Sequence, residues 1–252
     1  MAIEPKSSVA RPPDAATRPY GDNGAVTDSI RAAALTATPQ LVIFDLDGTL
    51  TDSAEGIVAC FLHALTQIGA EVPQGEDLAA QIVGPPMDDT FHAMELGGRA
   101  EEAIAAFRAE YGARGWAMNT LFDGIAPLLA DLEASGIRLA VATSKLETTA
   151  RRILHHFGLD HHFEVIAGAS ADGARKSKTE VLAHALQQLQ PLPERVLMVG
   201  DRSHDVDGAA AHGIDTVVVG WGYGQADFAD LIDAAGVTFA ATMADLRGAL
   251  GV

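Results

Sequence analysis

Two carboxylates stand two residues apart directly after an apolar run. Asp45 and Asp47 follow Leu-Val-Ile-Phe at 41–44, and Gly48 and Thr49 complete the segment. A carboxylate pair at this spacing can supply a nucleophile and a proton donor or acceptor. Gly48 permits a tight turn, and Thr49 offers a hydroxyl and an N–H to a phosphate oxygen. Turns after strands also favour Asp and Gly, so the alternative interpretation of this segment is an ordinary strand-to-turn sequence.

A second acidic segment has the same place relative to an apolar run. Gly-Asp-Arg-Ser-His-Asp at 200–205 follows the run 196–199, which puts Asp201 and Asp205 after a predicted strand. The hard cation Mg²⁺ takes carboxylate, carbonyl and water oxygens. If the two strands are neighbours, Asp45 and Asp201 converge, and a cation offsets the repulsion that would otherwise raise their pKa values. The alternative is a helix N-cap, which can also apply to Asp205.

Two weaker polar segments accompany the acidic ones. Thr143 and Ser144 follow the apolar run 138–142 and can hold phosphate oxygens, although helix caps have the same composition. The basic segment Arg-Lys-Ser-Lys at 175–178 precedes a predicted helix, and an ammonium there can neutralise a phosphate. Cations near a helix start oppose the helix dipole, which favours a functional reason for this segment.

The apolar runs that carry these residues alternate with helical patterns. Strands are predicted at 41–44, 138–142, 163–167, 195–199 and 216–219, and helices at 126–134, 147–157, 179–190 and 205–212. This alternation predicts βαβ units and a parallel sheet between two helical layers, which is an α/β fold with an α/β/α core. Ligands bind at the carboxyl edge of such sheets.

One stretch breaks this alternation. Residues 53–121 show helical periodicity and no strand pattern, which predicts a helical insert of about seventy residues. It starts just after the first acidic segment and is therefore placed to cover it. We expect a tail at 1–38, a core at 39–52 and 123–252, and a helical domain at 53–122.

Bulk composition excludes several classes of protein. The formal net charge is −17, which disfavours nucleic acid and anionic membranes as partners. No segment has the apolar length of a membrane span. The single cysteine, Cys60, allows no internal disulfide, so we expect a soluble cytoplasmic protein. Its place in the sequence predicts that it packs on the apolar face of a helix. The tail at 1–38 has the composition of a disordered segment.

The four segments together resemble the signatures of the haloacid dehalogenase superfamily of phosphohydrolases. These are Asp-x-Asp-Gly-Thr, a Thr or Ser at a strand end, a Lys ahead of a helix, and Gly-Asp-x-x-x-Asp; the resemblance extends from about Leu41 to the C-terminus. It implies a Rossmann-like three-layer core with a small helical cap domain inserted after the first strand, and hinges near 51–53 and 121–124. The segment Gly-Pro-Pro-Met-Asp-Asp at 84–89 resembles the cap loop that faces the active site, and a plain turn between helices is the alternative.

The resemblance also implies roles for the four carboxylates. Asp45 would attack phosphorus and form an aspartyl-phosphate, and Asp47 would act as general acid and then as general base. Mg²⁺ would be bound by Asp45, by the carbonyl of Asp47 and by Asp201, with Asp205 supporting this shell.

Phosphate contacts follow from the same resemblance. Thr143 and the N–H of Ser144 would hold phosphoryl oxygens. The family lysine is open between two positions, because an ungapped comparison with the usual Lys-Pro pattern favours Lys176. An Asp-Gly-x-Arg-x-x-Lys-x-Glu-Val subgroup favours Lys178, which we prefer, with Arg175 as a second contact to the anion.

The implied activity is hydrolysis of small phosphate monoesters, with 5′-nucleotidase-like or phosphoglycolate-phosphatase-like specificity. A sugar phosphomutase and a non-catalytic phospho-ligand binding protein are the alternatives. A dehalogenase is disfavoured because it would not need Asp47. We expect a small phosphorylated metabolite as partner, no nucleic acid, no membrane, and a monomer or homodimer.

Two further patterns receive no catalytic role. Four histidines between 155 and 162 match no standard zinc spacing. The Gly-rich segment 220–224 lacks the context of a dinucleotide fingerprint and is interpreted as a loop at the rim of the site.

Overall fold

Six parallel strands form the centre of the molecule. The computed structural model describes residues 38–73, 78–225 and 234–252, so the predicted tail lies outside the described residues except for Thr38. The strands are β1 (Leu41–Phe44), β4 (Arg138–Leu146), β5 (Val165–Ala169), β6 (Val196–Gly200), β7 (Asp215–Val219) and β8 (Val237–Ala240). Their order in the sheet is β5-β4-β1-β6-β7-β8. Strand β1 therefore pairs with both β4 and β6, and the predicted convergence of the two acidic segments becomes possible.

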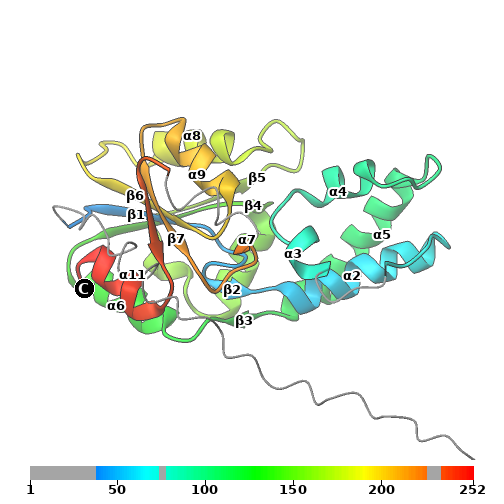
Figure 1. Ribbon diagram of the computed structural model, residues 1–252, viewed down its shortest axis with the longest axis horizontal. Coiled ribbons are helices and arrows are strands. Elements are labelled where there is room, and N and C mark those ends of the chain that lie inside the picture. The colour runs from blue at the N-terminus through cyan, green and yellow to red at the C-terminus, as the bar shows by residue number, and fades with distance from the viewer. Residues whose placement is uncertain (1–37, 74–77, 226–233) are drawn as a thin grey trace, which may run out of the picture. The chain divides into compact units, whose positions relative to one another are not determined.

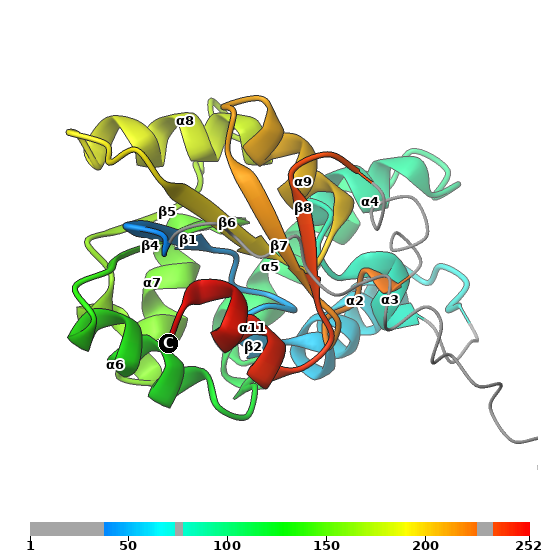
Figure 2. The same cartoon turned by 60° about the vertical axis from the view of Figure 1, so that its left-hand side comes forward.

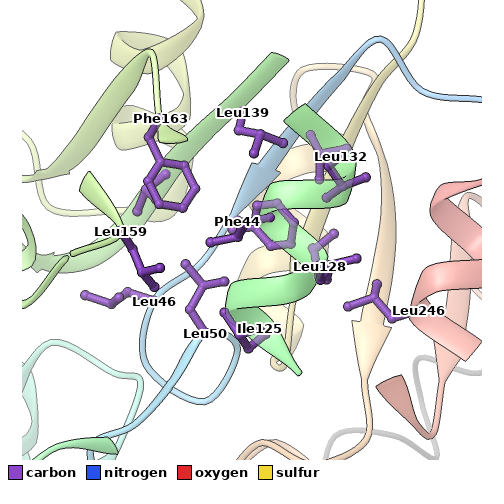
Figure 3. Close-up of a cluster of buried hydrophobic side chains, with 14 of the residues drawn as sticks. Phe44, Leu46, Leu50, Ile125, Leu128, Leu132, Leu139, Leu159, Phe163 and Leu246 are labelled. Carbon is purple, nitrogen blue, oxygen red and sulfur yellow. The ribbon is translucent and has the colours of Figure 1, made fainter. Parts of the chain in front are cut away.

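Burial on both faces explains why β1 is apolar throughout. Val42 and Phe44 belong to one core cluster, whereas Leu41 and Ile43 belong to another, as the two-residue period of a strand requires. All four side chains are fully buried. Figure 3 shows the first cluster, in which Phe44 lies beside Leu128. Full burial of each such side chain contributes about 1.5–3 kcal/mol, so the sheet is held mainly by these two clusters.

Helices cover the two faces of the sheet. They are α6 (Ile125–Ala134), α7 (Glu147–His156), α8 (Lys178–Gln188), α9 (Ser203–Ala210) and α11 (Met243–Leu250). The cluster containing Phe44 takes side chains from α6, α7 and α11, and the cluster containing Ile43 takes them from α8 and α9 (Figures 1 and 2). The predicted three-layer α/β/α core is confirmed.

The cap consists of the residues between the short strands β2 (Thr51–Asp52) and β3 (Thr120–Leu121). These strands pair antiparallel and carry the chain out of the core and back. The cap elements are α2 (Ala54–Gln67), α3 (Leu78–Ile82), α4 (Met87–Ala93), α5 (Ala100–Ala113) and the 3₁₀ turn η1 (Gly115–Ala117), as Figure 1 shows. A helical insertion after β1 is thus confirmed, while its limits at 53 and 122 remain our interpretation.

Aromatic side chains form the interior of the cap. Phe61 stacks on Phe91 at 5.1 Å between ring centroids, Phe91 meets Phe107 edge-on at 6.1 Å, and Phe107 stacks on Tyr111 at 5.5 Å. Cys60 is buried in the same cluster, as expected from its helical position. Aromatic pairs of this kind add stability beyond the area they bury.

Several element limits differ from the predicted ones. Strand β5 starts at Val165 rather than at Phe163, because Phe163 follows the 3₁₀ turn η2 (Asp160–His162) and packs into the core without pairing. Strand β4 continues to Leu146, with a register shift after Thr143. Strand β8 and helix α11 were not predicted, since β8 lies at the sheet edge and is only partly buried.

Helix starts near the predicted site depend on local capping. Helix α8 begins at Lys178, one residue earlier than predicted, because Ser177 accepts from Glu180 N–H and Glu180 accepts from Ser177 N–H in a capping box. Helix α9 begins at Ser203, where Asp205 accepts the N–H of Arg202. Among the described residues, none of the helices has both the length and the apolar character needed to cross a lipid bilayer.

Candidate active site

Four buried carboxylates gather at the carboxyl edge of the sheet. Asp45 follows β1, Asp201 follows β6, and the Asp45 N–H donates to Val199 O at 2.8 Å. The exposed fractions are 3% for Asp45, 8% for Asp47, 1% for Asp201 and 0% for Asp205. Carboxylates are seldom buried without partners, so the partners of these four decide what the site can do.

Lys178 joins three of the segments that the sequence indicated. Its Nζ lies 2.9 Å from Asp45 Oδ1 and 2.7 Å from Asp205 Oδ1, and it donates to Ala142 O at 3.0 Å. Burial lowers the pKa of Lys178, but the two carboxylates outweigh burial and raise it, so the ammonium stays charged. Lys176 is exposed, and its backbone N–H donates to Glu180. Of the two candidate lysines, Lys178 is the one in contact with the carboxylates.

The pKa values of these carboxylates shift in different directions because the groups share one small buried volume. Burial raises the pKa of Asp45 despite the nearby Lys178. Burial and the charges of Asp205 and Asp45 raise the pKa of Asp201 well above its usual range. Burial also acts to raise the pKa of Asp205, but contact with Lys178 lowers it overall. One lysine therefore does not neutralise this cluster, and a further positive charge would stabilise it.

A metal ion fits this cluster. Ligand atoms of Asp45, His204 and Asp205 lie within 4.8 Å of one another. Asp201, which the sequence indicated as a metal ligand, is not one of these three residues, and its Oδ2 accepts the N–H of Tyr223 at 2.7 Å. Carboxylate oxygens are the donors that hard divalent cations prefer, so the Asp45–Asp205 cluster is a plausible metal site.

Two glycines let Asp201 approach the first acidic segment. A Cβ at position 48 or at position 222 would come within 2.3 Å of Asp201 Oδ2. Gly48 also has a φ of 82°, which an L side chain rarely adopts. The glycine of Asp-x-Asp-Gly-Thr is therefore needed for space as well as for the turn.

Three of the residues predicted to bind phosphate, Thr143, Ser144 and Thr49, lie near the carboxyl ends of β4 and β1, at the same edge of the sheet. Thr143 is buried at the end of the regular part of β4, and its Oγ1 accepts the N–H of Lys145 at 3.2 Å. Ser144 follows it and is half-buried. Thr49 is buried, and among the described residues its Oγ1 has no hydrogen-bond partner, so this hydroxyl is available to a ligand.

Arg175 is engaged away from the carboxylate cluster. Its Nε donates to Gly168 O at 2.7 Å, and its Nη2 lies 2.7 Å from Glu147 at the start of α7. Those contacts fix the loop before α8 and so help to place Lys178. A direct contact of Arg175 with a substrate anion would require it to leave Glu147.

Lys145 was not expected in the site. Its Nζ lies 2.7 Å from Asp47 Oδ2 and donates to the hydroxyl of Tyr111 on α5 at 3.0 Å. Burial lowers the pKa of Lys145, but Asp47 and Tyr111 raise it overall, so this ammonium also stays charged. The lysine follows Thr143 and Ser144 directly, but nothing in the local sequence shows which way it points.

Arg202 connects the second acidic segment to the cap. It follows Asp201, is 8% exposed, and donates from Nη2 to Ala80 O of α3. A Cβ at position 84 would lie 2.5 Å from Arg202 Nε, and the φ of 111° at Gly84 favours glycine there. The turn that begins at Gly84 thus lies against the loop after β6, whereas Asp88 farther along pairs with Arg108 of the cap.

Tyr223 connects the rim loop to the first hinge. Its hydroxyl donates to Asp52 Oδ1 at 2.6 Å and accepts the N–H of Ser53 at 2.8 Å. Its own backbone N–H holds Asp201. The segment 220–224 therefore bridges a carboxylate of the site and the start of the cap, a role that its Gly-rich composition did not reveal.

His204 is a further residue that sequence reasoning left without a role. Its Nε2 is buried and, within the described part of the chain, accepts or donates no hydrogen bond. Its place between the two carboxylates of Gly-Asp-x-x-x-Asp was the available signal, because it lies in the first turn of α9, directly after β6.

Comparison with known proteins finds similar sequences and a similar solved structure. Tyrosine-protein kinase PtkA of Mycobacterium tuberculosis is 68% identical over 246 residues, which are 92% of this chain and 84% of that protein. A 5′-nucleotidase of Pseudomonas aeruginosa is 41% identical over 192 residues, covering 74% of this chain and 85% of that protein. The solved structure of the Mycobacterium tuberculosis PtkA superposes with a TM-score of 0.76 at 73% identity, covering 85% of this chain and 99% of that one.

The family itself is shown by a model that spans most of the described chain. The model for haloacid dehalogenase-like hydrolases matches residues 42–219, which include all four signature segments. The superfamily resemblance is thereby confirmed, and the chain belongs to the haloacid dehalogenase-like hydrolase family.

Proposed function

We propose that this protein is a Mg²⁺-dependent phosphatase that hydrolyses small phosphate monoesters through a phosphorylated Asp45. The observation that carries the proposal is the way Asp45 is held. Its Oδ1 is bound by Lys178 at 2.9 Å and by the Leu46 N–H at 2.7 Å. These contacts fix the carboxylate and leave Oδ2 to attack phosphorus.

The first half of the reaction transfers the phosphoryl group to Asp45. Oδ2 forms a bond to phosphorus while the bond from phosphorus to the ester oxygen breaks. Asp47 donates a proton to that oxygen, so the alcohol leaves neutral. In the second half, Asp47 takes a proton from water, the water oxygen bonds to phosphorus, and the bond to Asp45 breaks. Inorganic phosphate leaves, and both carboxylates regain their initial state.

Charge neutralisation supports both halves. Lys178 offsets the negative charge that gathers when a phosphate approaches Asp45, and Thr143, the Ser144 N–H and the Thr49 hydroxyl are placed to bind phosphoryl oxygens. When bound by Asp45, the Asp47 carbonyl and Asp201, with Asp205 supporting them, Mg²⁺ would supply the remaining positive charge.

The burial of the site favours a small substrate. All four carboxylates are nearly inaccessible while Arg202 and Lys145 hold cap contacts, so a substrate enters when the cap moves and is then enclosed. A nucleoside 5′-monophosphate is the first candidate because of the Pseudomonas 5′-nucleotidase, and phosphoglycolate is the second. The monomer or homodimer that we expect requires no second chain to complete this site. A sugar phosphomutase would use the same residues with a sugar phosphate as acceptor.

A second function is favoured by the name of the 68% identical relative. In a protein tyrosine kinase of this design, Asp45 would bond to the terminal phosphorus of a nucleoside triphosphate, and the nucleoside diphosphate would leave. A tyrosine hydroxyl would then attack phosphorus in place of water, with Asp47 taking the phenolic proton. This acceptor is a protein side chain, so it would have to reach a carboxylate that is 3% exposed, which requires a larger cap displacement than a small ester does.

The decisive experiment compares acceptors in one preparation. Release of phosphate would be measured with Mg²⁺ from nucleoside 5′-monophosphates, phosphoglycolate and sugar phosphates, and phosphotyrosine formation from a nucleoside triphosphate and a tyrosine peptide. We expect Mg²⁺-dependent release of phosphate that falls at least about 10³-fold in Asp45→Asn. The matched control is Asp207→Asn, an exposed carboxylate on α9, which should keep wild-type activity.

Other outcomes separate the alternatives. Phosphotyrosine formation without ester hydrolysis would establish the kinase in place of the phosphatase. Isomerisation of a sugar phosphate without release would establish the mutase. If Asp45→Asn retains full hydrolysis, the phospho-aspartyl route is wrong.

A further inference from the structure

Asp47 is held differently from Asp45. Its Oδ2 lies 2.7 Å from Lys145 Nζ, whereas its buried Oδ1 has no hydrogen-bond partner among the described residues. One oxygen is therefore fixed, and the other has its hydrogen-bonding capacity left for a ligand that enters the site. A group that must deliver a proton to a substrate oxygen needs this combination of a fixed orientation and one free oxygen.

Lys145 depends in turn on the cap. Its Nζ donates to the Tyr111 hydroxyl at 3.0 Å and lies 4.8 Å from the centre of the Tyr111 ring. Tyr111 belongs to α5 and stacks on Phe107 inside the cap, so its position is set by the cap and not by the core. The ammonium is thus shared between a core carboxylate and a cap phenol.

The backbone around Lys145 also points to a specific role. The pairing of β4 with β5 shifts register between Thr143 and Leu146, so Lys145 lies at an irregularity of the strand. Such irregularities re-aim a side chain, and they occur often beside active sites. The Lys145 side chain is only 9% exposed, which is unusual for a lysine and requires its charge to be satisfied inside.

We propose that Tyr111 and Lys145 position Asp47 for proton transfer, so that the acid–base step is ready only when the cap lies on the core. This role rests on the proposed phosphatase function and deepens it. Lysine has a long, flexible stem, and the Tyr111 contact restricts it to the conformation that holds Asp47 Oδ2. When the cap moves away, Lys145 loses the phenol, and Asp47 loses its fixed orientation. Water that enters the open site is then activated poorly, because the general base Asp47 is out of position.

The test uses two substrates that differ in their need for a proton. An alkyl phosphate has a poor leaving group and needs the general acid, whereas p-nitrophenyl phosphate leaves well without it. The quantity to compare is kcat/KM, which includes the steps through transfer to Asp45 and not the later hydrolysis of the aspartyl-phosphate. The variants are Lys145→Met, which removes the charge, Lys145→Arg, which keeps it, and Tyr111→Phe, which removes only the hydroxyl.

We expect Lys145→Met to lower kcat/KM about 100-fold for the alkyl phosphate and less than about 5-fold for p-nitrophenyl phosphate. Tyr111→Phe should lower kcat/KM about 10-fold for the alkyl phosphate and about 2-fold for p-nitrophenyl phosphate, because Lys145 still contacts Asp47 but is held less firmly. Lys145→Arg should recover part of the loss on the alkyl ester.

The matched control is Arg152→Met. Arg152 makes a cap contact of the same kind, with its guanidinium 3.6 Å from the centre of the Trp116 ring and a hydrogen bond to Gly112 O, but Asp47 is not its partner. Loss of a cap contact alone should change both substrates by the same factor. Equal losses on both substrates in Lys145→Met and Tyr111→Phe would overturn the positioning role.

A spectroscopic readout separates this proposal from the phosphatase proposal. In the wild type, the Lys145 ammonium should give a proton–nitrogen NMR signal protected from solvent exchange, which Tyr111→Phe shifts and Asp47→Asn removes. A signal unaffected by Asp47→Asn would overturn the contact itself. If that signal behaves as expected but the wild type hydrolyses neither ester, the phosphatase proposal fails, and the proton-transfer role fails with it while the contact stands.

Discussion

The carboxyl edge of the sheet and the interior of the cap are both buried, but they are buried for opposite reasons. The edge holds four carboxylates and two lysines, among them Asp45, Asp205 and Lys178. The cap interior holds stacked aromatic rings, among them Phe61 and Phe91. Burial of the rings stabilises the fold, whereas burial of charges costs free energy that ion pairing offsets only in part. The edge is therefore organised for chemistry at the expense of stability, and the cap supplies packing.

The largest expected effect is the loss of the lysine that pairs two carboxylates. Lys178→Met should lower the free energy of unfolding of the metal-free protein by about 3–5 kcal/mol at neutral pH, since Asp45 and Asp205 lose their buried partner. It should also abolish turnover. Urea unfolding and phosphate release measure the two effects. Lys176→Met is the control, because Lys176 is exposed, and a similar loss there would show that the edge tolerates either lysine.

The cap interior should respond to loss of volume instead of loss of charge. Phe91→Ala removes a fully buried ring that contacts Phe61 and Phe107, and it should destabilise the cap by about 3–5 kcal/mol. Hydrogen exchange should then increase in α2 and α5 while β1 and β6 keep their protection. Equal loss of protection in both regions would show that cap and core unfold as one cooperative unit.

Removal of a single carboxylate at the sheet edge should raise the free energy of unfolding, whereas the two changes above lower it. The pKa of Asp201 is raised in the folded state, so its ionised form costs stability above the pKa of the unfolded chain, and the cost vanishes below it. Asp201→Asn should therefore raise the free energy of unfolding of the metal-free protein by about 1–2 kcal/mol at pH 7. The gain should shrink toward zero near pH 3.

Mg²⁺ sharpens this prediction, because a cation that binds the folded site stabilises it by mass action. Thermal unfolding with and without Mg²⁺ should show a rise in Tm for the wild type and a smaller rise for Asp201→Asn. A lower stability of Asp201→Asn at pH 7 without metal would mean that Asp201 is already compensated in the folded protein.

The smallest effect concerns Cys60 in the cap. Burial raises the pKa of this thiol to about 11, so little thiolate exists at neutral pH. A thiol reagent should label the native protein slowly at pH 8, and faster as the pH rises toward that value, because the thiolate is the nucleophile. Labelling should accelerate in Phe91→Ala, whose cap opens more often. Rapid labelling of the native wild type at pH 8 would show that the cap interior is accessible.

Local sequence patterns predicted strands and helices correctly where burial imposes a regular spacing of apolar residues. The run at 41–44 is apolar because helices cover both faces of β1, and the acidic residues after it were correctly placed at a strand end. Prediction of strands failed where an apolar residue does not pair in the sheet, or where a paired strand is not fully buried. Phe163 is buried without pairing, and β8 pairs at the sheet edge although it is only partly buried.

The choice between Lys176 and Lys178 shows the limit of motif comparison. Both lysines fit a known spacing, and they differ in capping. Ser177 caps α8, so Lys178 lies in the first turn of the helix, where its Nζ reaches Ala142 O and Asp45. Lys176 stays in the exposed loop before the helix.

The sequence by itself determined the α/β/α core, the helical insertion and the placement of Asp45 and Asp201 at neighbouring strand ends, because each follows from patterns within a few residues. Only the tertiary structure decided which side chains contact which carboxylates. Lys145 joins Asp47 to Tyr111, and Tyr223 joins Asp201 to Asp52, through partners that lie far apart along the chain. No local period encodes such contacts, since they depend on where the folded sheet and the packed cap bring separate segments together.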